Sequence, residues 1–216
     1  MPGVPALLVR RSLADVERAN ALFGGTRAVL AELRPLLAAG GGRPMTLLDV
    51  GTGAADIGAA AQAEAAKRAV PLAVVGVDTS LALALQAARR LGSAVAANAL
   101  ELPFADRSVD IVVCSQLLHH FSEREIASVL GELHRVARVR VIVSDLQRSW
   151  IAAAGIWLMS FPLRFHPISR HDGVLSVLRG FTPAELNAHV VRATGTSPSV
   201  SRRIGWRLTA AWTPLP

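Results

Sequence analysis

The feature that most constrains this chain is a short apolar run that ends in two closely spaced glycines and leads into an alanine-rich segment. Residues 48–56 read Leu-Asp-Val-Gly-Thr-Gly-Ala-Ala-Asp. Glycine permits a tight turn and a close approach of the backbone to a ligand, and N–H groups at the start of a helix point at that ligand. We therefore expect a strand, a ligand-binding turn and a helix; an ordinary tight turn is the simpler alternative.

Apolar runs then alternate with helical segments. Residues 72–77 are continuously apolar, as expected of a strand buried on both faces of a parallel sheet. Ser122 and Glu125 have the spacing of a capping box that opens a helix. This alternation predicts a parallel sheet with right-handed crossovers. The expected strands are 46–50, 72–77, 94–97, 109–114 and 139–143, and the expected helices are 54–68, 79–91 and 122–136.

The N-terminal part of the chain differs from this pattern. Leu13, Val16 and Ala19 recur at helical spacing and predict a helix within residues 12–37, interrupted near Gly24. Three consecutive glycines follow that helix and predict a linker into the main fold.

The expected domain organisation follows from these changes in pattern. Residues 1–44 form an N-terminal helical segment, and residues 45–216 form the main domain. Within that domain we expect an insertion at about 147–181, with a loop at 165–173. The last part, 197–213, is expected to form two strands joined by a hairpin, which adds an antiparallel edge pair.

Polar residues follow the expected strands where these end. Asp78 ends the second strand, where a carboxylate is placed to accept both hydroxyl groups of a ribose. Its simpler alternative is a solvated acid or a helix cap. Asn98 follows the third strand, and Ser115 and Gln116 follow the fourth. Because ligands bind at the carboxyl ends of strands in open α/β sheets, these residues are candidates for a common site.

The ordered set LDVGTGAADI, VVGVDTS, NALELPFADRSVDIVV and LLHHF resembles the class I S-adenosylmethionine (SAM)-dependent methyltransferases, especially those of ubiquinone and menaquinone biosynthesis. The resemblance covers residues 47–145. It implies an α/β fold with a Rossmann-like, seven-stranded, mostly parallel sheet, an antiparallel terminal strand and helices on both faces. It also implies an enzyme that uses SAM and releases S-adenosylhomocysteine (SAH).

The resemblance implies how the glycine turn would bind SAM. Asp49, Gly51 and Gly53 would line the amino-acid moiety, with Thr52 beside them. A dinucleotide is the poorer alternative, because its fingerprint needs a third glycine where this chain has Asp56. A carboxylate there would face a pyrophosphate, whereas SAM carries no phosphate.

The resemblance also implies contacts to the adenosine. Asp78 would hold the ribose hydroxyls, Thr79 would flank the adenosine, and Asn98 and Ala99 would contact the adenine. Two positions depart from the family pattern. Ala55 replaces a common third glycine, and Asn98 replaces a common aspartate, whose charge strengthens a hydrogen bond. We expect similar or weaker SAM affinity and no change of cofactor.

Methyl transfer from a sulfonium requires alignment, exclusion of water and, for a phenol or carbon acid, a proton acceptor. By the resemblance, Ser115 and Gln116 would lie beside the sulfonium. His120 follows the fourth strand on the cofactor side, and His171 lies in a polar stretch with Asp172 as an orienting carboxylate. The candidate bases are His119, His120, His166 and His171, of which His120 and His171 are the ones selected. The alternatives are a packing role for His119 or His120 and a solvated turn at His171.

The acceptor is expected to be small and hydrophobic: a phenol, a quinone or a polyketide-like molecule, with O-methylation favoured over C-methylation. The apolar segment that contains Trp157 forms either a lid over such a molecule or a core helix packed on the sheet. Arg164 and Arg170 could meet an acidic group on the acceptor, and His166 is a further candidate contact.

Charge and composition bound the other partners. The formal net charge is +7, but the arginines are scattered and aromatic residues make up 5%, so a nucleic-acid partner is not expected. Peripheral contact with a membrane is compatible with this charge, but the apolar segment after residue 149 is too interrupted to span one. We expect a cytoplasmic protein of undetermined oligomeric state, with Cys114 buried and no bound metal.

Two further function classes compete with a small-molecule methyltransferase. A non-catalytic module with the same fold could act through protein contacts, although the intact cofactor motifs argue against it. A protein or nucleic-acid methyltransferase is the other class. Methylation of a base amino group is disfavoured because no Asn-Pro-Pro-Tyr motif follows the fourth strand, and the chain contains no tyrosine.

Overall fold

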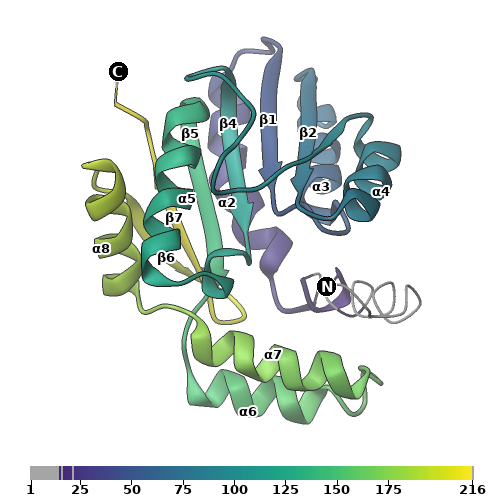
Figure 1. The fold of residues 1–216 in the computed structure, drawn as a ribbon. Coiled ribbons are helices and arrows are strands. Elements are labelled where there is room, and N and C mark those ends of the chain that lie inside the picture. The colour runs from purple at the N-terminus through teal and green to yellow at the C-terminus, as the bar shows by residue number, and fades with distance from the viewer. Residues whose placement is uncertain (1–14, 16, 21, 216) are drawn as a thin grey trace.

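The computed structural model describes residues 15, 17–20 and 22–215. Seven strands form one sheet in the order β3-β2-β1-β4-β5-β7-β6 (Figure 1). The first five run parallel, and β7 is antiparallel to both β5 and β6. This confirms the predicted fold class, including the terminal hairpin. The strands are β1 Met45–Val50, β2 Leu72–Asp78, β3 Ala94–Ala96, β4 Val109–Ser115, β5 Ala137–Leu146, β6 Ser199–Arg203 and β7 Arg207–Trp212.

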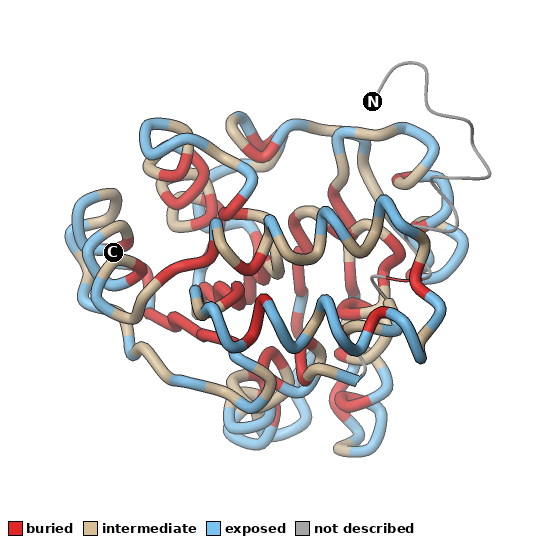
Figure 2. Tube along the Cα trace, turned by 90° about the horizontal axis from the view of Figure 1, so that it is seen from below, coloured by how far each residue is buried: buried red, intermediate tan, exposed pale blue. Residues whose placement is uncertain are grey.

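Helices cover both faces of the sheet because successive side chains of each central strand point to opposite faces. In β1, Leu47 packs with α2, α3 and α4 on one face, whereas Leu48 packs with α5 and α8 on the other. Figure 2 shows the buried residues gathered in the strands at the centre. These helices are α2 Gly25–Ala39, α3 Asp56–Ala66, α4 Leu81–Leu91, α5 Glu123–Val136 and α8 Pro183–Thr194.

The predicted capping box is present at the start of α5. The Ser122 hydroxyl accepts a hydrogen bond from the Glu125 backbone N–H, and the Glu125 carboxylate accepts one from the Ser122 N–H at 2.9 Å. Two otherwise unsatisfied N–H groups are thus bonded, which fixes where the helix begins. The short 3₁₀ turn η1, Leu118–His120, lies between β4 and this helix.

Two helices lie beyond the carboxyl ends of the parallel strands (Figure 1). These are α6, Trp150–Met159, and α7, Pro167–Arg179, which pack on each other. The loop expected at 165–173 was wrong: Pro167 occupies the first helical turn, and the His166 ring accepts a hydrogen bond from the Ile168 N–H at 3.3 Å. A proline at this position and a capping side chain both favour a helix start.

The apolar helix α6 is not a core helix of the sheet. Ala152 and Ala153 are its buried residues, whereas Trp150 and Leu158 are exposed. No helix in the described part of the chain is long and apolar enough to cross a membrane.

The N-terminal segment packs against the β6–β7 hairpin. Residues 17–20 are helical, and α2 begins after Gly24, so the expected interruption is present; Leu13 and Val16 lie outside the described residues. Gly205, in the hairpin turn, has a φ of +80°, and a Cβ there would lie 2.0 Å from the Phe23 carbonyl oxygen. Only glycine fits this turn without moving the segment.

Gly205→Ala is therefore expected to lower the free energy of unfolding by about 1–3 kcal/mol, because it adds both backbone strain and a steric clash. Urea denaturation measures this change. Gly131→Ala in α5 is the matched control: no neighbouring atom lies within 4 Å of its would-be Cβ. That variant should be neutral or more stable by up to about 1 kcal/mol, and equal effects of the two variants would contradict the packing argument.

Candidate active site

Two cavities adjoin at the carboxyl ends of β1, β2 and β4. The glycine-turn cavity has a volume of about 90 Å³, and the strand-edge cavity one of about 220 Å³. Gly51 borders both. The structure thus brings together all ten residues expected at a SAM site, although their roles stay predictions. The first cavity contains Asp49, Gly51, Thr52, Gly53, Ser115 and Gln116, and the second contains Gly51, Asp78, Thr79, Asn98 and Ala99.

The glycine turn is fixed by hydrogen bonds to the neighbouring strand. The N–H groups of Gly51 and Thr52 both donate to the Val77 carbonyl oxygen at 2.9 Å. Gly51 has a φ of +75°, and a Cβ there would lie 2.9 Å from the Leu117 side chain. The Ala55 that replaces the family's third glycine also has a positive φ, 60°, and precedes α3. The turn therefore keeps its shape with a methyl group at this position.

Carboxylates gather around the glycine-turn cavity. The pKa of the fully buried Asp49 is raised to about 6, chiefly by burial, with the charges of Asp56 and Asp78 adding to it and the Thr52 hydrogen bond opposing it. Burial also raises the pKa of Asp56, which accepts a hydrogen bond from Asn20 Nδ2 at 3.1 Å. Such a negative environment suits a ligand with an ammonium and a sulfonium group.

The polar groups at the site fit SAM. The buried Ser115 hydroxyl has no hydrogen-bond partner among the described residues. Asp78 accepts from the Gly53 N–H at 3.1 Å and from the Ser80 N–H at 2.9 Å, and its oxygens keep lone pairs for ribose hydroxyls. Asn98 Oδ1 accepts from the Leu100 N–H at 3.0 Å, which directs the amide and leaves its NH₂ as a donor.

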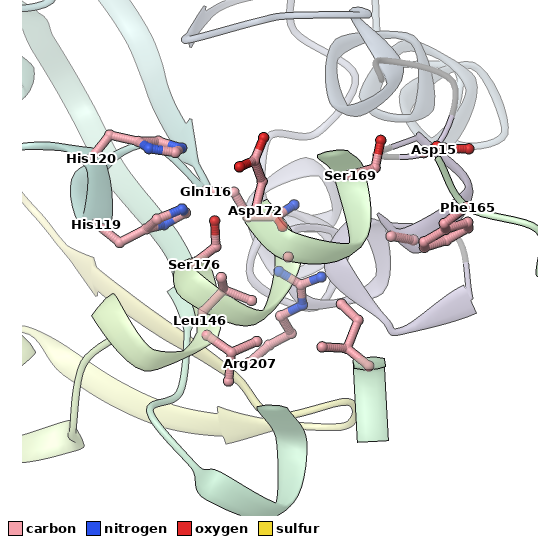
Figure 3. Close-up of a pocket in the computed structure, with 14 residues that line it drawn as sticks. Asp15, Gln116, His119, His120, Leu146, Phe165, Ser169, Asp172, Ser176 and Arg207 are labelled. Atoms are coloured by element: carbon pink, nitrogen blue, oxygen red, sulfur yellow. The ribbon is translucent and has the colours of Figure 1, made fainter. Parts of the chain in front are cut away.

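A third cavity, the α7 cavity, has a volume of about 240 Å³ and lies between the sheet edge and α7 (Figure 3). Gln116 borders both this cavity and the glycine-turn cavity. The wall is mostly apolar, with polar side chains at a few points. Its lining residues are Asp15, Ala19, Gln116, His119, His120, Leu146, Ile156, Phe165, Ser169, Asp172, Gly173, Ser176, Val177 and Arg207.

A buried histidine–carboxylate pair supports one side of the α7 cavity. His119 Nδ1 lies 2.6 Å from Asp145 Oδ1, and the Asp145 carboxylate also accepts from the N–H groups of Leu118 at 3.0 Å and Leu146 at 2.7 Å. The His120 ring lies beside the His119 ring, with 4.1 Å between ring centroids and a tilt of 41° between the ring planes. The pKa of His120 is lowered, chiefly by partial burial and next by the charge of the neighbouring His119. A neutral imidazole can accept a proton at neutral pH.

The other residues expected to contact substrate lie outside this cavity. His171 and Arg164 are exposed, and His166 caps α7. Arg170 donates to the Ser160 hydroxyl at 2.7 Å and lies 3.8 Å from the centroid of the Phe161 ring, which also stacks edge-on against Trp157. Arg170 therefore links α7 to the residues that follow α6, and Trp157 packs on one of them.

The face of α7 that lines the cavity was missed because the segment was read as a loop. Ser169, Asp172, Gly173 and Ser176 follow helical spacing and point to one side. If the segment had been assigned as a helix, Asp172 and not His171 would have been placed on the same side as Ser169 and Ser176. Arg207 and Asn20 carry no local signal, since only the tertiary fold brings them to the site.

The sequence comparisons agree with this geometry. Residues 48–143 match the family described as "Methyltransferase domain". Demethylmenaquinone methyltransferase from Roseiflexus sp. (strain RS-1) is 33% identical over 122 residues, which are 51% of this chain and 50% of the relative. The chain thus spans about half the length of the curated relative that it matches.

Solved structures show the same fold. A SAM-dependent methyltransferase from Aquifex aeolicus has a TM-score of 0.62 at 18% identity, over 94% of this chain and 97% of that one. Magnesium protoporphyrin IX methyltransferase from Synechocystis PCC 6803, crystallised with SAH, has a TM-score of 0.60 at 15% identity, over 89% of this chain and 84% of that one.

The sheet order and the glycine turn are those of the class I SAM-dependent methyltransferase fold, and residues 48–143 match a methyltransferase domain. Members of this class take the methyl group from SAM. More particularly, the similarity to the methyltransferase family named above lies in residues 48–143, which are less than half of this chain.

Proposed function

We propose that this chain transfers the methyl group of SAM to a small, hydrophobic phenolic, quinone or polyketide-like acceptor, with O-methylation favoured over C-methylation. The observation that carries the proposal is the shared wall at Gln116, where a mostly apolar cavity adjoins the cavity of the glycine turn. An acceptor in the first cavity and the amino-acid end of SAM in the second would meet at this wall. Their alignment and the exclusion of water are what the reaction requires.

In this proposal, Asp49 and the glycine turn hold the amino-acid end of SAM, and Asp78 holds the ribose. SAM supplies an activated methyl group when bound. His120 accepts the proton of the acceptor hydroxyl, since it borders the α7 cavity and its lowered pKa favours the neutral ring. His119 is a positioning residue, because Asp145 holds it and its ring contacts the His120 ring. His171, which lies outside the cavity, is given no step.

Residues 147–181, which include α6 and α7, are proposed as the substrate-recognition insertion of a main domain at 45–216. The support is that α7 forms one wall of the α7 cavity. The division at residue 44 and a cytoplasmic location stay predictions from the sequence.

The test offers methyl-labelled SAM with a panel of phenols, hydroquinones and hydroxylated fatty acceptors. Calorimetric binding of SAH together with label transfer to a phenolic or hydroquinone acceptor supports the proposal. Binding of SAH without transfer to any member favours the non-catalytic alternative, and absence of SAH binding refutes the methyltransferase proposal.

SAH affinity is expected to rise with pH between about 5 and 7. The ammonium group of SAH favours the ionised form of Asp49, whose pKa of about 6 means that a proton must leave before tight binding. Affinity should fall by up to about tenfold per pH unit below this pKa. Calorimetry across this range measures the profile. Asp49→Asn should bind more weakly and flatten it, and wild-type affinity that falls as pH rises would contradict the assignment.

Peripheral contact with an anionic membrane is proposed for α6. Its exposed face carries Trp150, Ile151 and Leu158, and Arg148 and Arg164 lie beyond its two ends. Exposed apolar groups flanked by arginines suit a negatively charged lipid surface. Leu158→Glu should reduce co-sedimentation with phosphatidylglycerol vesicles several-fold. Leu85→Glu, at an exposed position of α4, is the control and should not reduce it. Equal sedimentation of both variants and wild type would contradict it.

A further inference from the structure

Arg207 is a buried arginine whose side chain enters the α7 cavity (Figure 3). It is the first residue of β7 and pairs with Leu146 at the end of β5, so the sheet itself fixes its backbone. Its relative exposure is 3%. The residue is therefore held rigidly at the floor of the cavity and is shielded from bulk water.

The guanidinium of Arg207 lacks a charged partner within the part of the chain that the structure describes. Its Nε donates a long hydrogen bond of 3.4 Å to the Phe23 carbonyl oxygen, and its buried Nη1 donates to none of the described residues. Burial lowers the pKa of Arg207 to about 10, which still leaves the group protonated at neutral pH.

The neighbouring carboxylates do not bind Arg207. Asp145 acts on it electrostatically, but the Asp145 oxygens accept hydrogen bonds from His119 and from two backbone N–H groups. Asp15 pairs with Arg18 and accepts from the His166 N–H. Asp172 is exposed at the opposite wall, on α7.

A buried cation without a partner opposes folding, and an apolar side chain of similar size would avoid that cost. The Arg207 side chain lines a cavity of about 240 Å³, which is large enough for a small ligand. A planar guanidinium matches the two oxygens of a carboxylate. Leu146, Ile156, Phe165 and Val177 supply an apolar wall around the same space.

We propose that the α7 cavity binds an acceptor with an anionic oxygen group, best matched by a carboxylate, which Arg207 holds at the floor while the apolar wall holds the ring. This inference rests on the proposed function, because it names the class of acceptor for the same site: a small aromatic hydroxy acid. The anionic group fixes which oxygen of the acceptor faces Gln116 and the methyl donor.

The experiment compares 1-hydroxy-2-naphthoate with its neutral amide as ligands, by calorimetry, in the presence and absence of SAH. We expect the wild type to bind the acid at least about tenfold more tightly than the amide. Arg207→Met should abolish that preference and leave SAH affinity unchanged, and Arg207→Lys should retain part of it. Arg202→Met, which removes an exposed arginine from β6, is the matched control and should keep the full preference.

The outcomes separate this inference from the proposed function. Equal affinity of the wild type for acid and amide, with normal SAH binding, overturns the anionic site and leaves the methyltransferase proposal intact. Absence of SAH binding with a preserved acid preference refutes the methyltransferase proposal alone. Loss of the buried charge should leave the Arg207→Met protein at least as stable as the wild type. If that variant fails to fold, the wild-type comparison still decides.

Discussion

Asp145→Ala is expected to lower the free energy of unfolding by about 3–5 kcal/mol. The carboxylate is fully buried and accepts hydrogen bonds from Leu118 N–H, Leu146 N–H and the His119 ring. Alanine would leave these donors buried without an acceptor, and each such loss costs roughly 1–3 kcal/mol before water or relaxation compensates. Urea denaturation, followed by tryptophan fluorescence, measures the change.

Two variants test whether the burial of this network causes the effect. Asp145→Asn keeps the shape and one carbonyl oxygen, so it should fold and be destabilised less than the alanine variant. Asp106→Ala removes a carboxylate with 75% side-chain exposure that pairs with Arg135, and its effect should stay within about 0.5 kcal/mol. A loss of stability below about 1 kcal/mol for Asp145→Ala would show that the network contributes little.

Asp78→Ala should weaken SAH binding by at least about tenfold, or roughly 1.4 kcal/mol. The proposal gives Asp78 both ribose hydroxyls, and the structure adds a second reason. The Asp78 carboxylate also accepts from the Gly53 N–H, so its removal loosens the glycine turn at the other end of the ligand. Calorimetry with purified protein measures the affinity.

Glu101→Ala provides a matched control for Asp78, because Glu101 is an exposed acid in the loop beside the strand-edge cavity and does not line it. Its SAH affinity should equal that of the wild type. Asp78→Asn, which keeps one acceptor oxygen, should lie between the two. Unchanged affinity of Asp78→Ala would remove the ribose assignment.

The sheet and the glycine turn were predictable because the sequence patterns that indicate them are local. Each parallel strand is a short apolar run, and the turn at Gly51 needs a backbone conformation that glycine adopts easily. The capping box at Ser122 is likewise contained within four residues. The positions of these strands, of the turn and of the helix start could therefore be predicted without knowledge of their neighbours in space.

The substrate side was less predictable because its structure depends on packing between distant segments. The polar stretch around His171 indicated a turn, yet α6 provides a surface against which it forms a helix. Arg207 looks like an ordinary strand arginine until the fold buries it beneath α7. Such residues are identified by tertiary contacts, which one sequence does not reveal.

The short N-terminal strip that contains Asp15 and Asn20 touches both halves of the site. Asp15 borders the α7 cavity and accepts from the His166 N–H, while Asn20 borders the glycine-turn cavity and bonds to Asp56 and Gln116. Displacing this strip would open the α7 cavity and the glycine-turn cavity at the same time. Under the proposed function, entry of the acceptor and release of SAH would both depend on this displacement, so their rates would change together.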